Sequence, residues 1–282
     1  MNVQPFLLDS LNARWKRYNL ELKNCRDEFS EEAVHDFRVV ARRLLASLDL
    51  LRATIRSAKI KKMRRILKDQ LDDLDELRDT QVLLADISEN VHDFPSLQPF
   101  EEYLLRQEKK LMRAARKEIR SLEVTDLSAQ IRKLNKAITT SSLSDLDVGL
   151  FAVIDEAYAK VIRRYKQIDP AQPATIHRLR IAFKKFRYMV ESIHPIIEGF
   201  PEDYLKRMHD YQTLMGDIQD MEVALHELAE FEKHAPAGYD PEPVRAYYRE
   251  HHSLAIFHYI EDKGEALSFW RPAPDQPFPQ EK

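Results

Sequence analysis

The stretch "VHDFRVVARRLLASLDLL" at residues 34–51 has the periodicity of an amphipathic α-helix. Its apolar residues recur at spacings of three and four, and they are Phe37, Val40, Leu44, Leu48 and Leu51. With about 100° of rotation per residue, these side chains share one face of a helix. His35, Arg38 and Arg42 fall on the opposite face. We therefore expect the helix to pack through its apolar side and to present a basic stripe to solvent.

Helical spacing of apolar residues continues through most of the chain, and runs of alternating β-branched residues are absent. Five glycines among 282 residues leave few positions for tight turns between strands or for glycine-rich phosphate loops. The sequence therefore predicts an all-α fold. The predicted helices, separated mostly at prolines, span roughly residues 6–28, 31–56, 60–92, 97–122, 126–139, 145–168, 173–197, 202–234 and 242–265.

A second stretch, "IHRLRIAFKKFRYMVESI" at residues 176–193, matches the first at an offset of 142. The matched pairs are His35 with His177, Arg38 with Arg180, Arg42 with Lys184, Arg43 with Lys185, and Asp49 with Glu191. Farther along the chain, "LRDTQV" at 77–82 matches "IQDMEV" at 218–223 at an offset of 141. Because both matches occur in the same order, we infer an internal tandem duplication that forms two pseudo-symmetric antiparallel helical bundles.

The segment "TTSSLSD" at residues 139–145 is rich in turn-forming residues and predicts the seam between the two halves. The halves are then residues 1–141 and 142–270, which together form one domain. The remaining tail, residues 271–282, is rich in proline and is predicted to be disordered.

Positive charge is concentrated in the matched stretches, although the net charge of the chain is −3. Residues 35–68 contain eleven Lys or Arg residues and two acidic residues. Residues 160–188 contain nine Lys or Arg residues and one acidic residue. A face selected for solubility usually mixes the two signs, because like charges three or four residues apart repel each other. The segregation favours a binding surface for a polyanion. Further candidate bases on other predicted helices are Arg64, Arg65, Lys68, Arg113 and Arg116.

The two matched motifs resemble the signatures of the CHAD family, a helical domain built as two related bundles. Each half has an H-x-x-R-x-x-x-[RK]-[RK] pattern and a later apolar-x-D-x-x-V pattern, and the resemblance covers residues from the first helix to about 265. It implies binding of inorganic polyphosphate in a basic groove or pore between the halves, often at polyphosphate granules. The contacts that it implies are His35, Arg38, Arg42, Arg43, His177, Arg180, Lys184, Lys185 and Arg187. Leu45 departs from the pattern, because it stands where the second half has Arg187.

We expect no enzymatic activity and no cofactor or metal. The E-x-E-x-K motif of the triphosphate-hydrolysing domain found fused to some family members does not occur. A metal-dependent phosphohydrolase that used His35 and Asp36 would need ligands that converge, yet adjacent residues on a helix lie about 100° apart. A histidine phosphotransfer bundle leaves the doubled motif unexplained. RNA or DNA binding through the phosphate backbone is the main alternative, although Tyr188 is the only aromatic residue on the stripe for stacking on bases.

The chain has a single cysteine, Cys25, and no run of about 18 apolar residues. These features predict a cytoplasmic protein without a membrane span. Arg78 lies close to the apolar side of its helix, which favours a paired, partly buried arginine over a ligand contact.

Overall fold

The computed structural model describes residues 3–55, 57–201, 203–273 and 276–279, and its regular elements in these ranges are all helices. This confirms the all-α prediction for the described residues. The α-helices are α1 (Val3–Asp27), α2 (Glu31–Thr54), α3 (Ala58–Asp72), α4 (Asp75–Asn90), α5 (Gln98–Ser121), α6 (Thr125–Thr140), α7 (Leu143–Tyr165), α8 (Ala174–Ile193), α9 (Tyr204–Glu232) and α10 (Glu242–Asp262). Short 3-10 helices cover Pro95–Leu97, His194–Ile196 and Lys263–Leu267.

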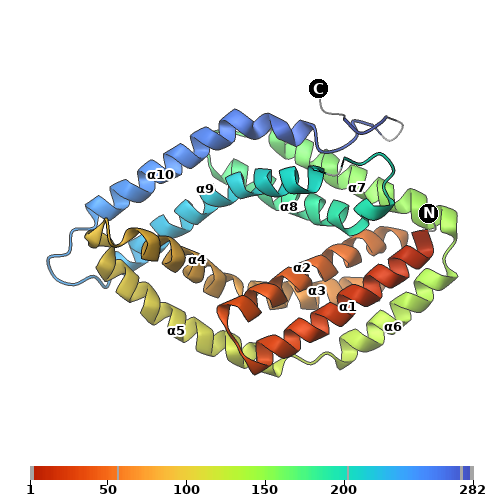
Figure 1. Cartoon of the computed structure of the whole chain (residues 1–282), viewed down its shortest axis with the longest axis horizontal. Helices are drawn as coiled ribbons and strands as arrows, with labels where there is room; N and C mark the ends of the chain where they lie inside the picture. Colours follow the sequence, from red (N-terminus) through yellow and green to blue (C-terminus); the bar gives the residue numbers. More distant parts are fainter. Residues whose placement is uncertain (1–2, 56, 202, 274–275, 280–282) are drawn as a thin grey trace.

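The helices form an elongated ring in which α2, α4, α8 and α9 face the middle of the molecule (Figure 1). Each inner helix has an outer neighbour, because α1 packs on α2, α5 on α4, α7 on α8 and α10 on α9. The ring closes at two places. At one of them α2 contacts α7 and α8, and at the other α4 contacts α9.

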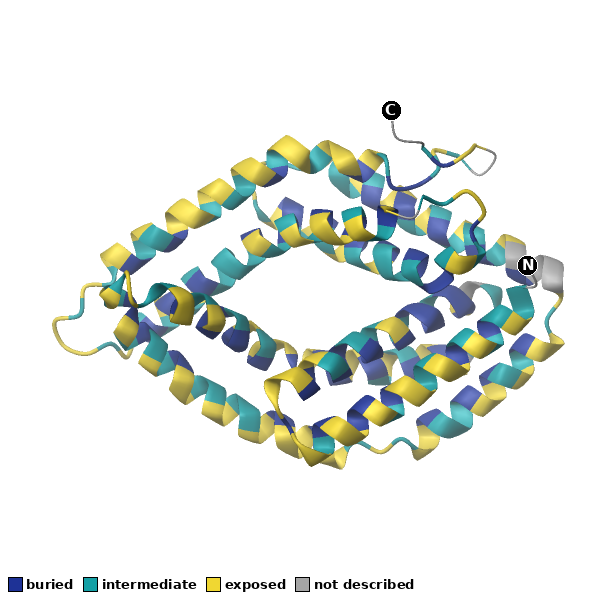
Figure 2. Cartoon of the chain, in the orientation of Figure 1, coloured by how far each residue is buried: buried dark blue, intermediate teal, exposed yellow. Residues whose placement is uncertain are grey.

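The apolar faces predicted from the sequence form the core of this ring. In α2, the five residues predicted to face inward are all buried. The same is true of the apolar face of α8, which contains Leu179, Phe183, Phe186, Val190 and Ile193. One large apolar cluster contains residues from both halves, and a smaller one lies where α4, α5, α9 and α10 meet. Exposed residues dominate the outward faces of α5 and α10 (Figure 2). None of the helices in the described ranges is long and apolar enough to span a bilayer.

Local sequence explains how α2 begins. The Ser30 side chain accepts a hydrogen bond from the amide of Ala33, and Glu31 and Glu32 follow in the first turn. These side chains satisfy a free amide and complement the positive end of the helix dipole. The start of α2 is therefore fixed by residues adjacent in sequence.

The predicted helix over residues 60–92 is wrong in one respect, because α3 ends at Asp72 and a separate helix, α4, begins at Asp75. No proline marks this break, and the apolar spacing continues through Leu71, Leu74 and Leu77, which are all buried. The periodicity therefore could not reveal it. The interruption leaves the Leu71 carbonyl available to a side chain, and Arg38 donates to it.

Two predicted boundaries remain, the seam between the halves and the start of the tail, and both stay predictions. The junction between α6 and α7 falls at residues 141–142, inside the segment predicted as a seam. The tail was predicted to be disordered, yet Phe278 is buried against Trp270 and Phe200, and Pro279 accepts a hydrogen bond from Tyr204. Proline content predicted disorder, but it does not account for one aromatic side chain that fits into an apolar cluster. Residues 274–275 and 280–282 of the tail lie outside the described residues.

Candidate anion-binding site

Bases from the two matched stretches meet where α2 approaches α8. Lys184, on α8, is half-buried, and its pKa is lowered to about 7. Burial is the main cause, and the charges of Arg42 and Arg180 add to it, while the Asp75 carboxylate acts in the opposite direction. None of the ion pairs within the described chain involves Lys184. Three bases from two helices thus share a region in which the lysine has no direct ion pair among the described residues.

Arg38 does not lie on the solvent face of α2, so that part of the prediction is wrong. Only 2% of the residue is exposed. Its guanidinium donates to Asp75 Oδ1 at 2.6 Å and to the Leu71 carbonyl at 3.2 Å. The physical reason is that the end of α3 and the start of α4 cover this side of α2. Asp75 also lies 3.8 Å from the Arg42 guanidinium, and it is about half exposed.

Arg180, the residue matched to Arg38, has a different environment. Its Nε atom is buried and has no hydrogen-bond partner among the described residues. Gly216 lies opposite the guanidinium, because a Cβ atom built on this glycine would be 3.9 Å from Arg180 Nη2. A buried donor without a partner has lost its hydrogen bonds to water and has gained none in the protein. Binding of an acceptor supplies the missing hydrogen bond.

Arg43 and Lys185 are exposed, but each forms an ion pair with a carboxylate of the other half. Arg43 Nε lies 2.8 Å from Glu191 Oε1, and Lys185 Nζ lies 3.5 Å from Asp49 Oδ2. Because Arg43 matches Lys185 and Asp49 matches Glu191, the two pairs are reciprocal. They hold α2 and α8 together and reduce the charge that these bases offer to a ligand.

Arg187 lies deeper, with 12% of its side chain exposed. It donates to Gln212 at 3.0 Å, pairs with Glu191 at 3.5 Å and lies over the Tyr188 ring. Tyr188 is therefore already in contact with a cation on its own helix.

The two matched histidines have different partners. His35 is exposed and lines a surface pocket together with Arg78, whereas the His177 ring forms a hydrogen bond with Gln219. Positions 78 and 219 are matched in the sequence, so each histidine lies beside the corresponding residue of the next inner helix. Arg78 is half-buried as predicted, but it has no ion pair within the described residues.

Comparison with known proteins places this arrangement in a family. A model of the CHAD domain matches residues 9–229 of the sequence. The chain belongs to the CHAD family. Its fold is similar to the crystal structure of the CHAD domain from the plant Ricinus communis, with a TM-score of 0.66 and 17% sequence identity over 95% of this chain and 90% of that chain. No curated protein matches the sequence.

The further candidate bases of this CHAD domain are dispersed. Arg64 pairs with Asp49, and Lys68 pairs with Asp72 at 3.4 Å. Arg65 is exposed on α3, and Arg113 and Arg116 are exposed on α5. The ion pairs and hydrogen bonds of the described chain do not connect these last three bases to the Lys184 region.

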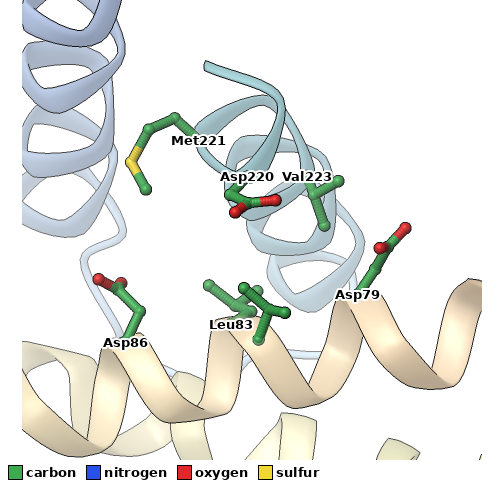
Figure 3. Close-up of a pocket in the computed structure, with 7 residues that line it drawn as sticks. Asp79, Leu83, Asp86, Asp220, Met221 and Val223 are labelled. Atoms are coloured by element: carbon green, nitrogen blue, oxygen red, sulfur yellow. The ribbon is translucent and has the colours of Figure 1, made fainter. Parts of the chain in front are cut away.

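Carboxylates are the component of the CHAD site that sequence reasoning missed. Asp79 and Asp220, the acids of the second motif, project from the facing helices α4 and α9 (Figure 3). Burial raises the pKa of both, that of Asp220 to about 6, and the nearby charges of Arg180 and Arg78 oppose the rise. Burial also raises the pKa of Asp217. The sequence contains a signal for these acids, because Asp79 and Asp220 occupy matched positions in the two halves.

These acids do not form a metal centre. Across the described ranges, no group of three or more His, Cys, Asp or Glu side chains is arranged to hold a metal ion. The site brings together the cationic donors of Arg42, Arg180 and Lys184 and the carboxylates of Asp79 and Asp220.

Proposed function

We propose that this CHAD domain binds inorganic polyphosphate, and that Arg42, Arg180 and Lys184 form the main contacts. One observation carries the proposal: Lys184 is half-buried beside two arginines and has no ion pair in the described chain. Like charges brought together at a cost in free energy are stabilised by a bound anion. Membership of the family supports polyphosphate as the ligand class, and the cluster of bases supports this location for its binding.

A linear phosphate polymer suits this cluster. Arginine offers forked donors that fit phosphate oxygens, and lysine adds a compact charge. Arg42 lies on α2, whereas Arg180 and Lys184 lie one turn apart on α8, about 6 Å along the helix axis. A long polyanion can contact both helices, whereas a single phosphate reaches fewer of these bases.

The proposed contact set differs from the nine residues implied by the resemblance. Arg38 is buried against Asp75, and Arg43 and Lys185 are paired across the halves. We therefore assign these three a supporting role. His35, His177 and Arg187 remain candidates for secondary contacts at the edge of the cluster.

The proposal is tested by titration with polyphosphate of one chain length. The variant Arg42→Gln/Arg180→Gln/Lys184→Gln is expected to bind more than about 100-fold more weakly, since each charge-assisted contact contributes roughly tenfold. A matched control removes three exposed bases at the C-terminal end of α7, of which Lys166 is the C-cap residue, in the variant Lys160→Gln/Arg163→Gln/Lys166→Gln. Equal losses in both variants would show that only overall charge matters.

A competition assay separates polyphosphate from nucleic acid. Wild-type protein is mixed with labelled polyphosphate and with mixed-sequence RNA or DNA oligonucleotides at equal phosphate concentration. We expect polyphosphate to be preferred, with affinity falling steeply as salt increases. Preference for the oligonucleotide would replace the proposed ligand.

We further propose that the protein acts by binding rather than by catalysis, in the cytoplasm and at polyphosphate granules. A phosphate-release assay with polyphosphate tests whether the protein lacks catalytic activity, and release above the triple variant's background would contradict this proposal.

A fluorescent fusion imaged with a polyphosphate stain tests the proposed localisation at granules, and separate localisation of the two signals would contradict it.

A further inference from the structure

Positions 75 and 216 are matched by the same offset of 141 that aligns the second motif, yet they hold an aspartate and a glycine. Each lies opposite the matched arginine of its own half. In the first half, Asp75 accepts from Arg38 at 2.6 Å. In the second half, the Cβ position of Gly216 lies 3.9 Å from Arg180 Nη2, and no side chain is present there to accept. The two halves therefore differ in one internal counter-ion.

This difference changes what each arginine can do. Arg38 donates hydrogen bonds to Asp75 and to the Leu71 carbonyl, and only 3% of its side chain is exposed. Asp75 also lies 3.8 Å from Arg42, so one carboxylate offsets charge on two bases. Arg180 retains a buried Nε without a partner, and none of the described carboxylates forms an ion pair with it.

The surrounding acids do not take over the role of Asp75 at Arg180. The charge of Arg180 acts to lower the pKa of three nearby carboxylates, those of Asp217 and Asp220 on α9 and of Asp79 on α4. None of the three forms an ion pair with it within the described part of the chain. The guanidinium therefore lies near negative charge but keeps donor capacity for a ligand.

From this asymmetry, and resting on the proposed function, we infer that the phosphate chain is held mainly through the second half, at Arg180. Gly216 keeps Arg180 free of an internal carboxylate, and Asp75 acts as a built-in anion that competes with the ligand for Arg42. Gly216 and Asp75 are thus affinity-determining residues that do not themselves bind phosphate.

The test adds a carboxylate to the second half. Gly216 has a helical backbone without positive φ, and nothing nearer than 3.9 Å meets an added Cβ, so a side chain is accommodated. Gly216→Asp is compared with Gly216→Asn, which has the same shape and no charge. We expect polyphosphate to bind about tenfold more weakly to the aspartate variant than to the asparagine variant. Asp75→Asn is expected to bind several-fold more tightly than wild type.

A second measurement does not depend on the ligand. Without polyphosphate and at low salt, Gly216→Asp should unfold at a higher urea concentration than Gly216→Asn, because the new carboxylate pairs with Arg180. Equal midpoints would overturn the inference. Equal polyphosphate affinities of the two variants would also overturn it while leaving the proposed function intact. Failure of wild-type protein to bind polyphosphate would instead refute the proposed function, and the urea comparison would still decide whether position 216 controls Arg180.

Discussion

Arg38 shows how one side chain can satisfy a binding motif and still belong to the protein interior. It occupies the arginine position of the first motif, but its guanidinium donates hydrogen bonds to Asp75 and to the Leu71 carbonyl. Buried arginines are tolerated when their donors are paired, and removing one leaves both a cavity and polar groups without partners. At this position the motif residue stabilises the junction of α2, α3 and α4.

Replacing Arg38 should therefore affect folding before it affects binding. We expect Arg38→Ala to lower the free energy of unfolding by about 2–3 kcal/mol, because two hydrogen bonds to a charged group are lost. Arg43→Ala, which removes a largely exposed ion pair, should cost less than about 1 kcal/mol. Urea denaturation of both variants measures the difference, and similar values would argue against a structural role for Arg38.

Lys184 should make ligand affinity depend on pH. Its pKa of about 7 in the free protein means that the amine loses its proton as the pH rises above 7, and a bound anion favours the protonated form. Affinity for polyphosphate should therefore decrease between pH 6 and pH 8.5 by roughly tenfold. Lys184→Arg stays charged through this range, so its binding should change less with pH.

Asp220 should also make the affinity for polyphosphate decrease as the pH rises, but over a lower pH range than Lys184. Its pKa of about 6 means that a negative charge appears beside Arg180 as the pH rises through 6. Asp220→Asn removes this contribution and leaves that of Lys184. Isothermal titration at several pH values separates the two groups, and an unchanged profile in Lys184→Arg would show that Lys184 is not a charge partner of the ligand.

At the scale of elements, α2 and α8 form a contact that combines binding bases with structural ion pairs. Arg43 pairs with Glu191 and Lys185 with Asp49, so each helix supplies one base and one acid to the other. The bases closer to the helix N-termini, Arg180 and Lys184, lack such partners within the described chain. Under the proposed function, we expect these ion pairs to restrict anion binding to the part of the stripe that precedes Lys185.

Single substitutions along these helices should show this division. We expect Arg43→Gln and Lys185→Gln each to weaken polyphosphate binding less than about threefold, since their charges are already offset. Arg180→Gln should weaken it about tenfold, because a free charged donor is lost. Parallel titrations of the three variants decide between this division and an evenly shared stripe, which would give equal losses.

At the scale of the whole molecule, the end of the chain joins the core of the ring. Phe278 is 9% exposed and contacts Trp270 and Phe200, while Arg271 pairs with Asp155 of α7 at 2.8 Å. These contacts connect the tail to α7 and to the loop before α9. Described residues beyond α10 therefore pack against the helices that precede them.

Truncation of this aromatic side chain should destabilise the protein. Phe278→Ala is expected to lower the free energy of unfolding by about 2–3 kcal/mol, somewhat less than for an aromatic residue in a central core. Gln276→Ala, at an exposed position two residues away, serves as the control. Identical urea midpoints for the two variants would indicate that the tail does not pack.

The helical fold class, the buried faces of α2 and α8 and the two basic stripes could all be predicted from the sequence. Those properties depend on spacing within one segment, and an α-helix converts spacing directly into direction. The tandem duplication, which the sequence also suggests, stays a prediction. The break between α3 and α4 was not predictable, because the apolar spacing continues through Leu74.

Which bases have an ion-pair partner depends on how the helices pack. The acid that neutralises Arg38 lies 37 residues away in sequence, and the one that pairs with Arg43 lies 148 residues away. Periodicity gives the direction in which a side chain points, but it does not say which other helix covers that direction. For this reason the basic stripes could be predicted from the sequence. The packing of the helices then buries Arg38 against Asp75 of α4 and leaves Arg180 and Lys184 without an ion pair in the described chain.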